Sequence, residues 1–284
     1  SEGRWIDSDK IRFWNGKPEK LKGWQKLTQT QFQGSCRGLI QWRDNSDNAL
    51  LAVGTHTHLY IYKGGVLYDV TPVTDSGNLS NAFAVTSGSS TVTVTDSAHG
   101  LLNGNRIVLG AASFNGVSWA ANTEFTVTVV NTNTYSFTAA QNASSTASSV
   151  GGTVAYQYLL NPGANNSVFE YGWGVGTWDT PRDNNYGWNV PSSGAGIEVD
   201  ARTWQFDTFG EDLVASVNGH PLIQWDASNG VANRAFFIND ALTSDSATPN
   251  TTRGVIVSTP DRHLVALGAD DPMTVAFASQ ETTG

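Results

Sequence analysis

Short apolar runs separated by tight turns recur along this chain, and residues 50–70 show the pattern most clearly. Their sequence, LLAVGTHTHLYIYKGGVLYDV, holds three apolar runs, which are separated by residues 55–57 and 63–65. The second break is Lys-Gly-Gly, and glycine readily adopts the positive φ angles that two-residue hairpin turns require. The segment therefore predicts a three-stranded antiparallel meander, the form of one blade of a β-propeller.

Two later segments repeat this order of an apolar run, a turn and a second run that ends in an aromatic residue. They are Asp212–Trp225 (DLVASVNGHPLIQW) and His263–Phe277 (HLVALGADDPMTVAF). Leu213 and Leu264 occupy equivalent places, and their spacing is close to the blade period of about 40–50 residues in propellers. We therefore expect further blades in the second half of the chain.

The middle of the chain differs in composition, because it is rich in Ser, Thr, Val, Ala and Asn and is almost uncharged. Polar and apolar residues alternate strictly in its best strand, Thr91–Asp96, and another strand is expected at Phe125–Val130. Gln141–Ser149 reads as a flexible Ser/Ala loop. The pattern predicts a small β-barrel or sandwich inserted between blades.

These patterns divide the chain into three parts. Residues 1–74 form a first propeller part, 75–160 the inserted small β-domain, and 161–284 a second propeller part. A propeller must close its ring, so we expect the chain to continue in the parent protein. The predicted fold class is all-β, with β-propeller-like blades and one inserted domain. Among 284 residues, 29 glycines and 10 tryptophans favour the same class.

Charge is distributed unevenly along the chain, whose net charge is −9. Residues 1–70 carry ten Lys or Arg and seven Asp or Glu, whereas residues 161–284 carry five and fifteen. Tight binding to a phosphate backbone needs clustered Lys and Arg, so this balance argues against it. It leaves open a loose passage of duplex DNA past a repelling wall. No apolar run reaches the length of a membrane-spanning helix, so we expect no membrane insertion.

Aromatic residues gather between glycines and asparagines in residues 161–190. They are Tyr171, Trp173, Trp178, Tyr186 and Trp188. Such a long loop is expected to be functional. It can pin itself onto its own scaffold or onto a neighbouring subunit, or it can form a stacking platform for sugars or bases. We expect the first role, with Trp5 and Trp24 as further interface residues.

Few residue patterns suggest chemistry. The two histidines of residues 56–58 have a spacing that can bind a metal, although the segment is also expected to be a polar turn. Asp207, Glu211 and Asp212 could supply paired carboxylates for glycoside hydrolysis, and residues 270–271 could contribute to a calcium site, but turns commonly carry such acids. No catalytic or phosphate-binding motif is present in the sequence. We therefore expect no enzymatic activity, no cofactor and no metal.

Several short segments of a shared pattern are distributed over 1–72 and 161–284. They are GRWID (3–7), IRF (11–13), GKPEK (16–20), LAVGT (51–55), LYDVTP (67–72), YGWG (171–174), WQFD (204–207), GEDL (210–213) and PDRHLVALG (260–268). Together they resemble the tail nozzle, or tail tubular, proteins of short-tailed bacteriophages, including packaged-DNA stabilisation proteins. VTVT (92–95), AHGL (98–101) and FNG (114–116) resemble a small β-domain of phage structural proteins.

This resemblance implies a non-enzymatic tail component of the virion. Such subunits form a ring, a homo-oligomer such as a hexamer, below the head-to-tail connector, and the ring retains the genome and passes it during ejection. Its partners would be the connector protein and tail fibre or tail tip proteins. An acidic lumen would repel DNA and let it slide, and the acids expected to face it are Asp207, Glu211, Asp212, Asp270 and Asp271.

Two alternatives remain open. One is a carbohydrate-binding tail adhesin that uses the aromatic loop 169–188. The other is a propeller glycoside hydrolase, which would need two facing carboxylates in a cleft.

Overall fold

The computed structural model describes residues 11–20, 26–163, 202–241, 248–280 and 283. The chain divides into two units, 1–31 and 32–284. The described strands of the first unit form a hairpin of β1 (Ile11–Trp14) and β2 (Lys17–Lys20). Asn15 and Gly16 both have positive φ angles at its turn, as the two central residues of this kind of hairpin turn require.

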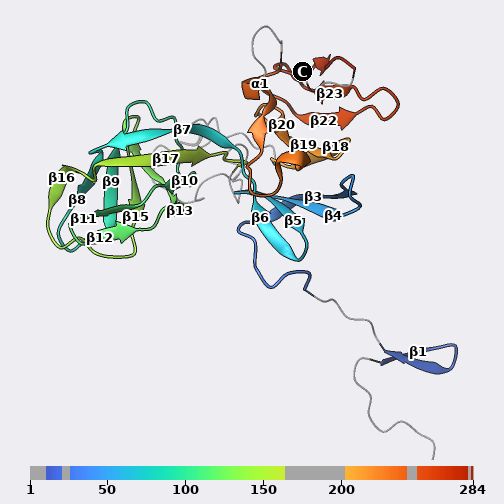
Figure 1. The fold of residues 1–284 in the computed structure, drawn as a ribbon, viewed down its shortest axis with the longest axis horizontal. Coiled ribbons are helices and arrows are strands. Elements are labelled where there is room, and N and C mark those ends of the chain that lie inside the picture. The colour runs from blue at the N-terminus through green and yellow to red at the C-terminus, as the bar shows by residue number, and fades with distance from the viewer. Residues whose placement is uncertain (1–10, 21–25, 164–201, 242–247, 281–282, 284) are drawn as a thin grey trace, which may run out of the picture. The chain divides into compact units, whose positions relative to one another are not determined.

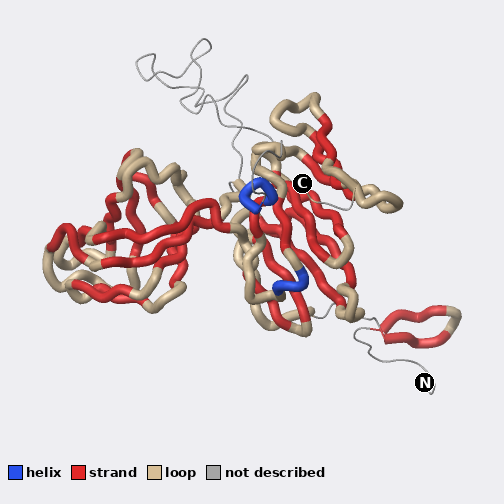
Figure 2. The backbone as a smooth tube through the Cα atoms, turned by 45° about the horizontal axis from the view of Figure 1, so that its top comes forward, coloured by secondary structure: helices blue, strands red, loops and turns tan. Residues whose placement is uncertain are grey.

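The described residues of the second unit are almost all in antiparallel strands, so the predicted all-β fold class is confirmed (Figures 1 and 2). The only helical elements among them are short: η1 (Ala227–Asn229) and α1 (Ile238–Ala241). No described helix has the length and apolar character needed to cross a membrane.

Outside the inserted domain, the described strands of this unit form three meanders. The first is β3 (Cys36–Arg43), β4 (Ala49–Thr55), β5 (Leu59–Lys63) and β6 (Val66–Asp69). The second is β18 (Trp204–Phe209), β19 (Asp212–Val217), β20 (Ile223–Trp225) and β21 (Phe236–Phe237). The third is β22 (Gly254–Val257), β23 (Leu264–Leu267) and β24 (Val275–Phe277). Each contains one of the repeated segments that the sequence pattern identified.

The second meander is covered on both faces. Leu213, Ala215 and Val217 of β19 share a core with Leu50, Ala52 and other residues of the first meander. Val214, between them in sequence, belongs to a different core, which it forms with residues of β22 and β23. Because side chains alternate along a strand, consecutive residues of β19 face opposite neighbours. The three meanders are therefore packed face to face in chain order, as blades are.

The inserted domain is a sandwich of two sheets (Figure 1). One sheet has the order β13 (Thr123–Thr126), β10 (Arg106–Leu109), β17 (Thr153–Leu159) and β7 (Val73–Ser80). The other has the order β14 (Thr128–Asn131), β15 (Thr134–Thr138), β9 (Thr91–Thr95), β8 (Phe83–Val85) and β16 (Ala147–Val150). A hairpin of β11 (Ala112–Phe114) and β12 (Val117–Trp119) lies outside both sheets.

One core fills the space between these sheets. Val92 and Val94 of β9 point into it, together with Tyr135 and Phe137 of β15, while the threonines of β9 point outward. The alternation read from the sequence is therefore confirmed. Of the two forms expected, the sandwich is right, because the described strands form no closed barrel.

Two local predictions in this domain are wrong. Phe125–Val130 is not one strand, because β13 ends at Thr126 and β14 begins at Thr128, and the two lie in different sheets. Val127, at the break, is buried and exchanges backbone hydrogen bonds with the loop at Gly104 and Asn105. Residues 147–149, expected in a flexible loop, belong to edge strand β16.

Candidate functional site

Trp204 of the second meander packs against the first meander and forms a hydrogen bond to it. Its indole Nε1–H donates to the Thr55 carbonyl oxygen at 2.7 Å, and its ring lies over two glycines. A Cβ atom added at Gly54 would lie 2.3 Å from Trp204 Cγ, and one added at Gly38 would lie 2.7 Å from Trp204 Cβ. Real side chains do not approach so closely. Only glycine at these two positions allows the indole to sit against the first meander.

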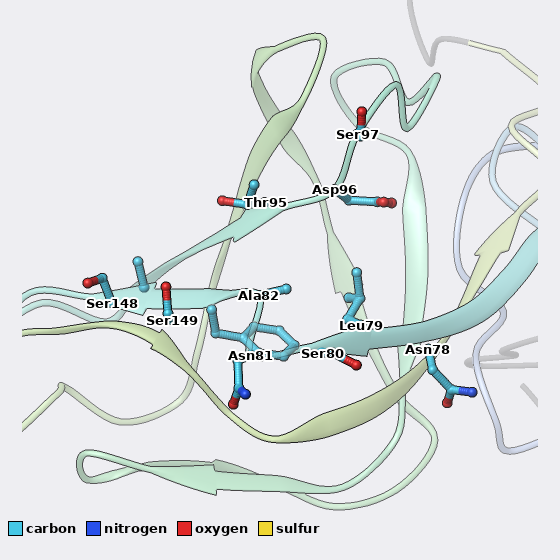
Figure 3. Close-up of a pocket in the computed structure, with 12 residues that line it drawn as sticks. Asn78, Leu79, Ser80, Asn81, Ala82, Thr95, Asp96, Ser97, Ser148 and Ser149 are labelled. Atoms are coloured by element: carbon cyan, nitrogen blue, oxygen red, sulfur yellow. The ribbon is translucent and has the colours of Figure 1, made fainter.

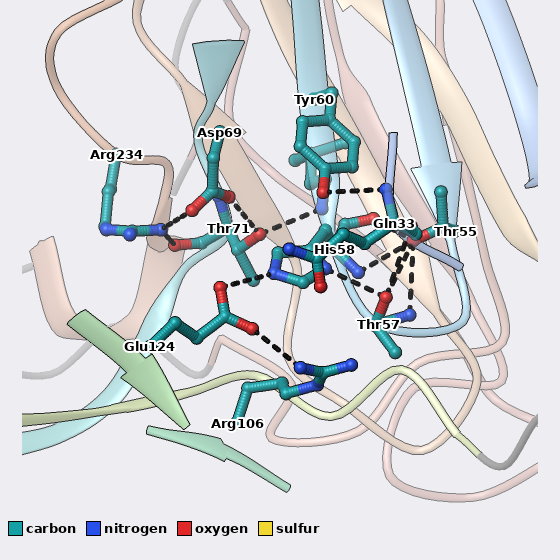
Figure 4. A network of polar contacts seen from close by, with 11 residues as sticks. Gln33, Thr55, Thr57, His58, Tyr60, Asp69, Thr71, Arg106, Glu124 and Arg234 are labelled. Atoms are coloured by element: carbon teal, nitrogen blue, oxygen red, sulfur yellow. Dashed lines mark hydrogen bonds and ion pairs between the residues drawn. The ribbon is translucent and has the colours of Figure 1, made fainter. Parts of the chain in front are cut away.

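A buried polar network joins the first meander to the inserted domain (Figure 4). The His58 side chain is only 1% exposed. Its Nδ1 lies 2.8 Å from Thr57 Oγ1, and its Nε2 lies 3.1 Å from Glu124 Oε2 in β13. Arg106 of β10 donates to the other oxygen of Glu124 at 3.1 Å. Both ring nitrogens of His58 are therefore engaged, and the carboxylate of Glu124 bridges the histidine and the arginine.

The same network ties the end of the first meander to the second. Thr71 donates its hydroxyl to Asp69 at 2.5 Å and accepts from the backbone N–H of Leu59. Arg234, which precedes β21, donates to the Thr71 carbonyl at 2.9 Å and pairs with Asp69 at the same distance. The exit of the first meander is thus held by side chains from a segment more than 160 residues later in the chain.

Further contacts close this network on the side of residues 33–35. Tyr60, stacked on His58 with ring centroids 5.3 Å apart, accepts from the backbone N–H of Gln33 at 3.2 Å, and burial raises its pKa to about 12. His56 Nδ1 accepts from the backbone N–H of Ser35 at 2.8 Å, and burial lowers the pKa of His56. Both histidines whose spacing could bind a metal therefore bond to protein groups. The described residues hold no group of three or more His, Cys, Asp and Glu able to bind a metal.

Two of the acids expected to face the lumen join neighbouring meanders through hydrogen bonds. Asp207 accepts from the backbone N–H of Val257 in β22 at 2.7 Å. Glu211 accepts from the backbone N–H of Asn45, in the β3–β4 turn, at 3.1 Å. Both side chains belong to half-buried residues. Their carboxylates thus bind backbone donors on opposite neighbours of the second meander.

Asp212 makes its hydrogen bonds within its own meander. It accepts from Gln224 Nε2 in β20 and from the backbone N–H of Ala227, each at 2.9 Å. Burial raises the pKa of this carboxyl. The three acids that could have supplied paired carboxylates are therefore directed to three different segments of the chain.

Asp270 and Asp271 lie together in the exposed turn that precedes β24. Asp270 accepts from the backbone N–H groups of Asn250 and Thr251 at 2.8 and 3.0 Å, and Asp271 accepts from that of Met273 at 2.8 Å. The bond of Asp271 is the local hydrogen bond typical of aspartate in turns, whereas the bonds of Asp270 join its turn to a segment about 20 residues earlier in the chain. Both carboxylates remain open to solvent.

The expected interface aromatics lie outside the described residues. They are Trp5, Trp24, Tyr171, Trp173, Trp178, Tyr186 and Trp188.

A polar hollow of about 390 Å³ opens at one edge of the sandwich, and no residue of it was predicted as a site (Figure 3). Its polar lining consists of Asn78, Ser80, Asn81, Thr95, Asp96, Ser97, Ser148 and Ser149. Asp96 accepts a hydrogen bond from the Tyr158 hydroxyl. Burial raises the pKa of Tyr158, so the phenol keeps its proton and remains the donor. The hollow holds no pair of carboxylates of the kind that glycoside hydrolysis needs.

Comparison with known proteins gives little. No protein-family model matches the chain, and no curated protein matches it. Among solved structures, the phage phi92 endosialidase matches with 15% sequence identity and a TM-score of 0.25. The match covers 82% of this chain and 35% of that one, so this chain spans about a third of that protein's length. A TM-score this low carries no argument about fold or function.

Proposed function

We propose that the chain is a non-enzymatic structural subunit of a bacteriophage tail, and specifically of a nozzle ring that retains and passes the genome. The tail assignment rests on the motifs at 3–20, 51–72 and 204–268, which resemble tail nozzle proteins. The hydrogen bonds of the polar side chains support the absence of enzymatic activity in this proposal. The described acids and histidines that could have served chemistry bond to the protein's own backbone or to one another.

The proposal rests most directly on the contacts that hold the meanders to one another and to the inserted domain. Trp204 fits against Gly38 and Gly54, and His58 and Glu124 hold the sandwich to the first meander. A well-packed interior resists deformation. A wall that confines DNA needs this kind of rigidity, whereas an enzyme would need an open cleft with available chemical groups.

The acids divide into two groups in this proposal. The first group, which makes structural hydrogen bonds and contributes charge only secondarily, consists of Asp207, Glu211 and Asp212. Asp270 and Asp271 are exposed and have solvent-facing carboxylates, so they are the acids best suited to repel DNA from a lumen wall. At physiological salt that repulsion extends over about 8 Å, so it lets DNA slide without binding it.

Electron microscopy of the full-length protein, alone and mixed with its connector, tests the proposal. We expect rings that have an axial hole wide enough for duplex DNA and that bind the connector. The double variant Asp270→Asn/Asp271→Asn should form the same rings but slow the passage of DNA through them. Monomers or trimers that ignore the connector and bind glycans would contradict the nozzle and support an adhesin that uses the loop 169–188.

A further inference from the structure

The polar hollow of the inserted domain contains a carboxylate whose orientation is fixed from the core. Asp96 follows β9, and its Oδ2 accepts a hydrogen bond from the hydroxyl of Tyr158, whose side chain is buried. Because the Tyr158 proton goes to Asp96, the Tyr158 oxygen accepts in turn from the hydroxyl of buried Tyr135, at 3.2 Å. The two tyrosines therefore hold one oxygen of Asp96 in place.

The second oxygen of Asp96 is available to a ligand. Asp96 is half-buried and lines the hollow (Figure 3). Its Oδ1 accepts no hydrogen bond from any residue that the structure describes. A hydrogen bond to an ionised carboxylate is about twice as strong as one between neutral groups. Oδ1 therefore offers a strong acceptor to a donor group that enters the hollow.

The rim of the hollow includes an irregular piece of backbone. The pairing of β16 with β8 shifts between Ala147 and Val150, which marks a β-bulge at Ser148 and Ser149. Ser149 has a φ of 56°, a conformation that serine rarely adopts. Bulges are common beside binding sites, where they redirect side chains. Here the bulge places two exposed serines at the hollow, and neither hydroxyl bonds to a described residue.

The composition of the lining narrows the class of ligand. It contains no Lys, Arg or His, so an anion would find no opposite charge there. It contains one carboxylate, whereas a calcium ion takes about six to eight oxygen ligands. The other polar groups are serine and threonine hydroxyls and asparagine amides, which both donate and accept hydrogen bonds. Half-buried Ala82 and Ala84 add apolar surface. A neutral ligand that has several hydroxyl groups and apolar C–H groups matches this lining.

We propose that this hollow binds a neutral saccharide. One sugar hydroxyl donates to Asp96 Oδ1, and other sugar oxygens accept from the serine hydroxyls and asparagine amides of the lining. Phe83 is fully buried, so its ring is not available for stacking, and recognition rests on hydrogen bonds. The site is distinct from the aromatic loop 169–188. It goes beyond the proposed nozzle function, because a structural subunit can carry a saccharide site on an inserted domain.

Isothermal titration calorimetry of the full chain with the methyl glycosides of glucose, galactose, mannose and N-acetylglucosamine tests this site. We expect at least one glycoside to bind, and to bind more tightly than glycerol, phosphate or calcium. Asp96→Asn keeps an acceptor for Tyr158 but presents a donor in place of Oδ1, so it should weaken binding at least about tenfold. The matched control is Asp75→Asn. Asp75 also accepts from a tyrosine hydroxyl, that of Tyr156, but lies outside the hollow, so this variant should bind as the wild type does.

Nuclear magnetic resonance locates the site in the wild-type chain, without any substitution. The backbone amide signals of Ser97, Ser148 and Ser149 should shift as the glycoside is added, and that of Ser216 in β19 should not. Shifts confined to the loop 169–188 would assign saccharide binding to the aromatic residues and overturn the proposal. Absence of binding by all four glycosides, equal binding of glycerol, or an unchanged affinity in Asp96→Asn would also overturn it. Ring formation tests the nozzle separately, so either proposal can fail alone.

Discussion

Replacing Gly54 by alanine tests the interlock between the first two meanders. Gly54 is not among the glycines with a positive φ angle, so alanine carries no backbone strain there. Its Cβ would, however, lie 2.3 Å from Cγ and 2.5 Å from Cδ1 of Trp204. The indole would have to move, and its hydrogen bond to the Thr55 carbonyl oxygen would be lost.

The magnitude follows from the two effects together. Overpacking a filled core costs about 1–3 kcal/mol. A buried donor or acceptor left without its partner costs a further ~1–3 kcal/mol. We therefore expect Gly54→Ala to lower the free energy of unfolding by about 2–6 kcal/mol, which is a large part of the stability of an ordinary domain.

Urea unfolding followed by far-ultraviolet circular dichroism measures this loss. The control is Gly64→Ala in the β5–β6 turn, where nothing lies within 4 Å of an added Cβ but φ is +59°. Its cost should be only about 1–2 kcal/mol, since it arises from backbone conformation alone. In a Trp204→Leu background the clash is relieved, so Gly54→Ala should cost at least ~1 kcal/mol less than in the wild type. A wild-type midpoint for Gly54→Ala, or an equal cost in both backgrounds, would refute the interlock.

Three further predictions concern polar groups. Asp44 accepts hydrogen bonds from Asn48. The bond from the Asn48 side chain has the largest effect on the pKa of Asp44, which is lowered to about 2. Its contribution to stability is therefore complete above its ordinary pKa of 3.8 and is lost as the pH falls through about 2, so Asp44→Ala should flatten that acid limb in unfolding midpoints measured from pH 5 to 2. Burial raises the pKa of Asp212 above 3.8, so the folded state binds more protons there and stability falls as the pH rises through the raised pKa. Asp212→Asn should remove this fall, and an unchanged slope of midpoint against pH above 4 would contradict it. Finally, Glu124→Leu leaves the buried ring of His58 without its acceptor and should lower the free energy of unfolding by about 1–3 kcal/mol, whereas Glu124→Gln, which keeps an acceptor, should lower it less, as thermal unfolding will show.

Local turn chemistry explains why much of the fold could be predicted from sequence. The meander at 50–70 depends on Gly64-Gly65, and both glycines have positive φ angles in the structure. The break at Val127 could not be predicted, because Phe125–Val130 is continuously compatible with a strand. What divides it is the backbone bonding of Val127 to the loop at 104–105, and such a contact leaves no local signal.

The polar sites show the same limit more strongly. The sequence reads Asp207, Glu211 and Asp212 as acids of one turn region, and all three were expected together. Their donors, however, lie on β22, on the β3–β4 turn and on the loop after β20. His58 was read as a polar turn residue, because its partner Glu124 is 66 positions away in the inserted domain. The roles of these side chains depend on long-range packing, which hydrophobic periodicity does not encode.

One sequence signal was clear in the pattern but acquires its meaning only from the structure. The runs at 254–257, 264–267 and 275–277 are apolar at nearly every position, which is the pattern of a strand covered on both faces. The second meander shows that such a sheet is stable here when both neighbours are present. The third has the same pattern and one described neighbour, so its sequence already specifies a second covering surface.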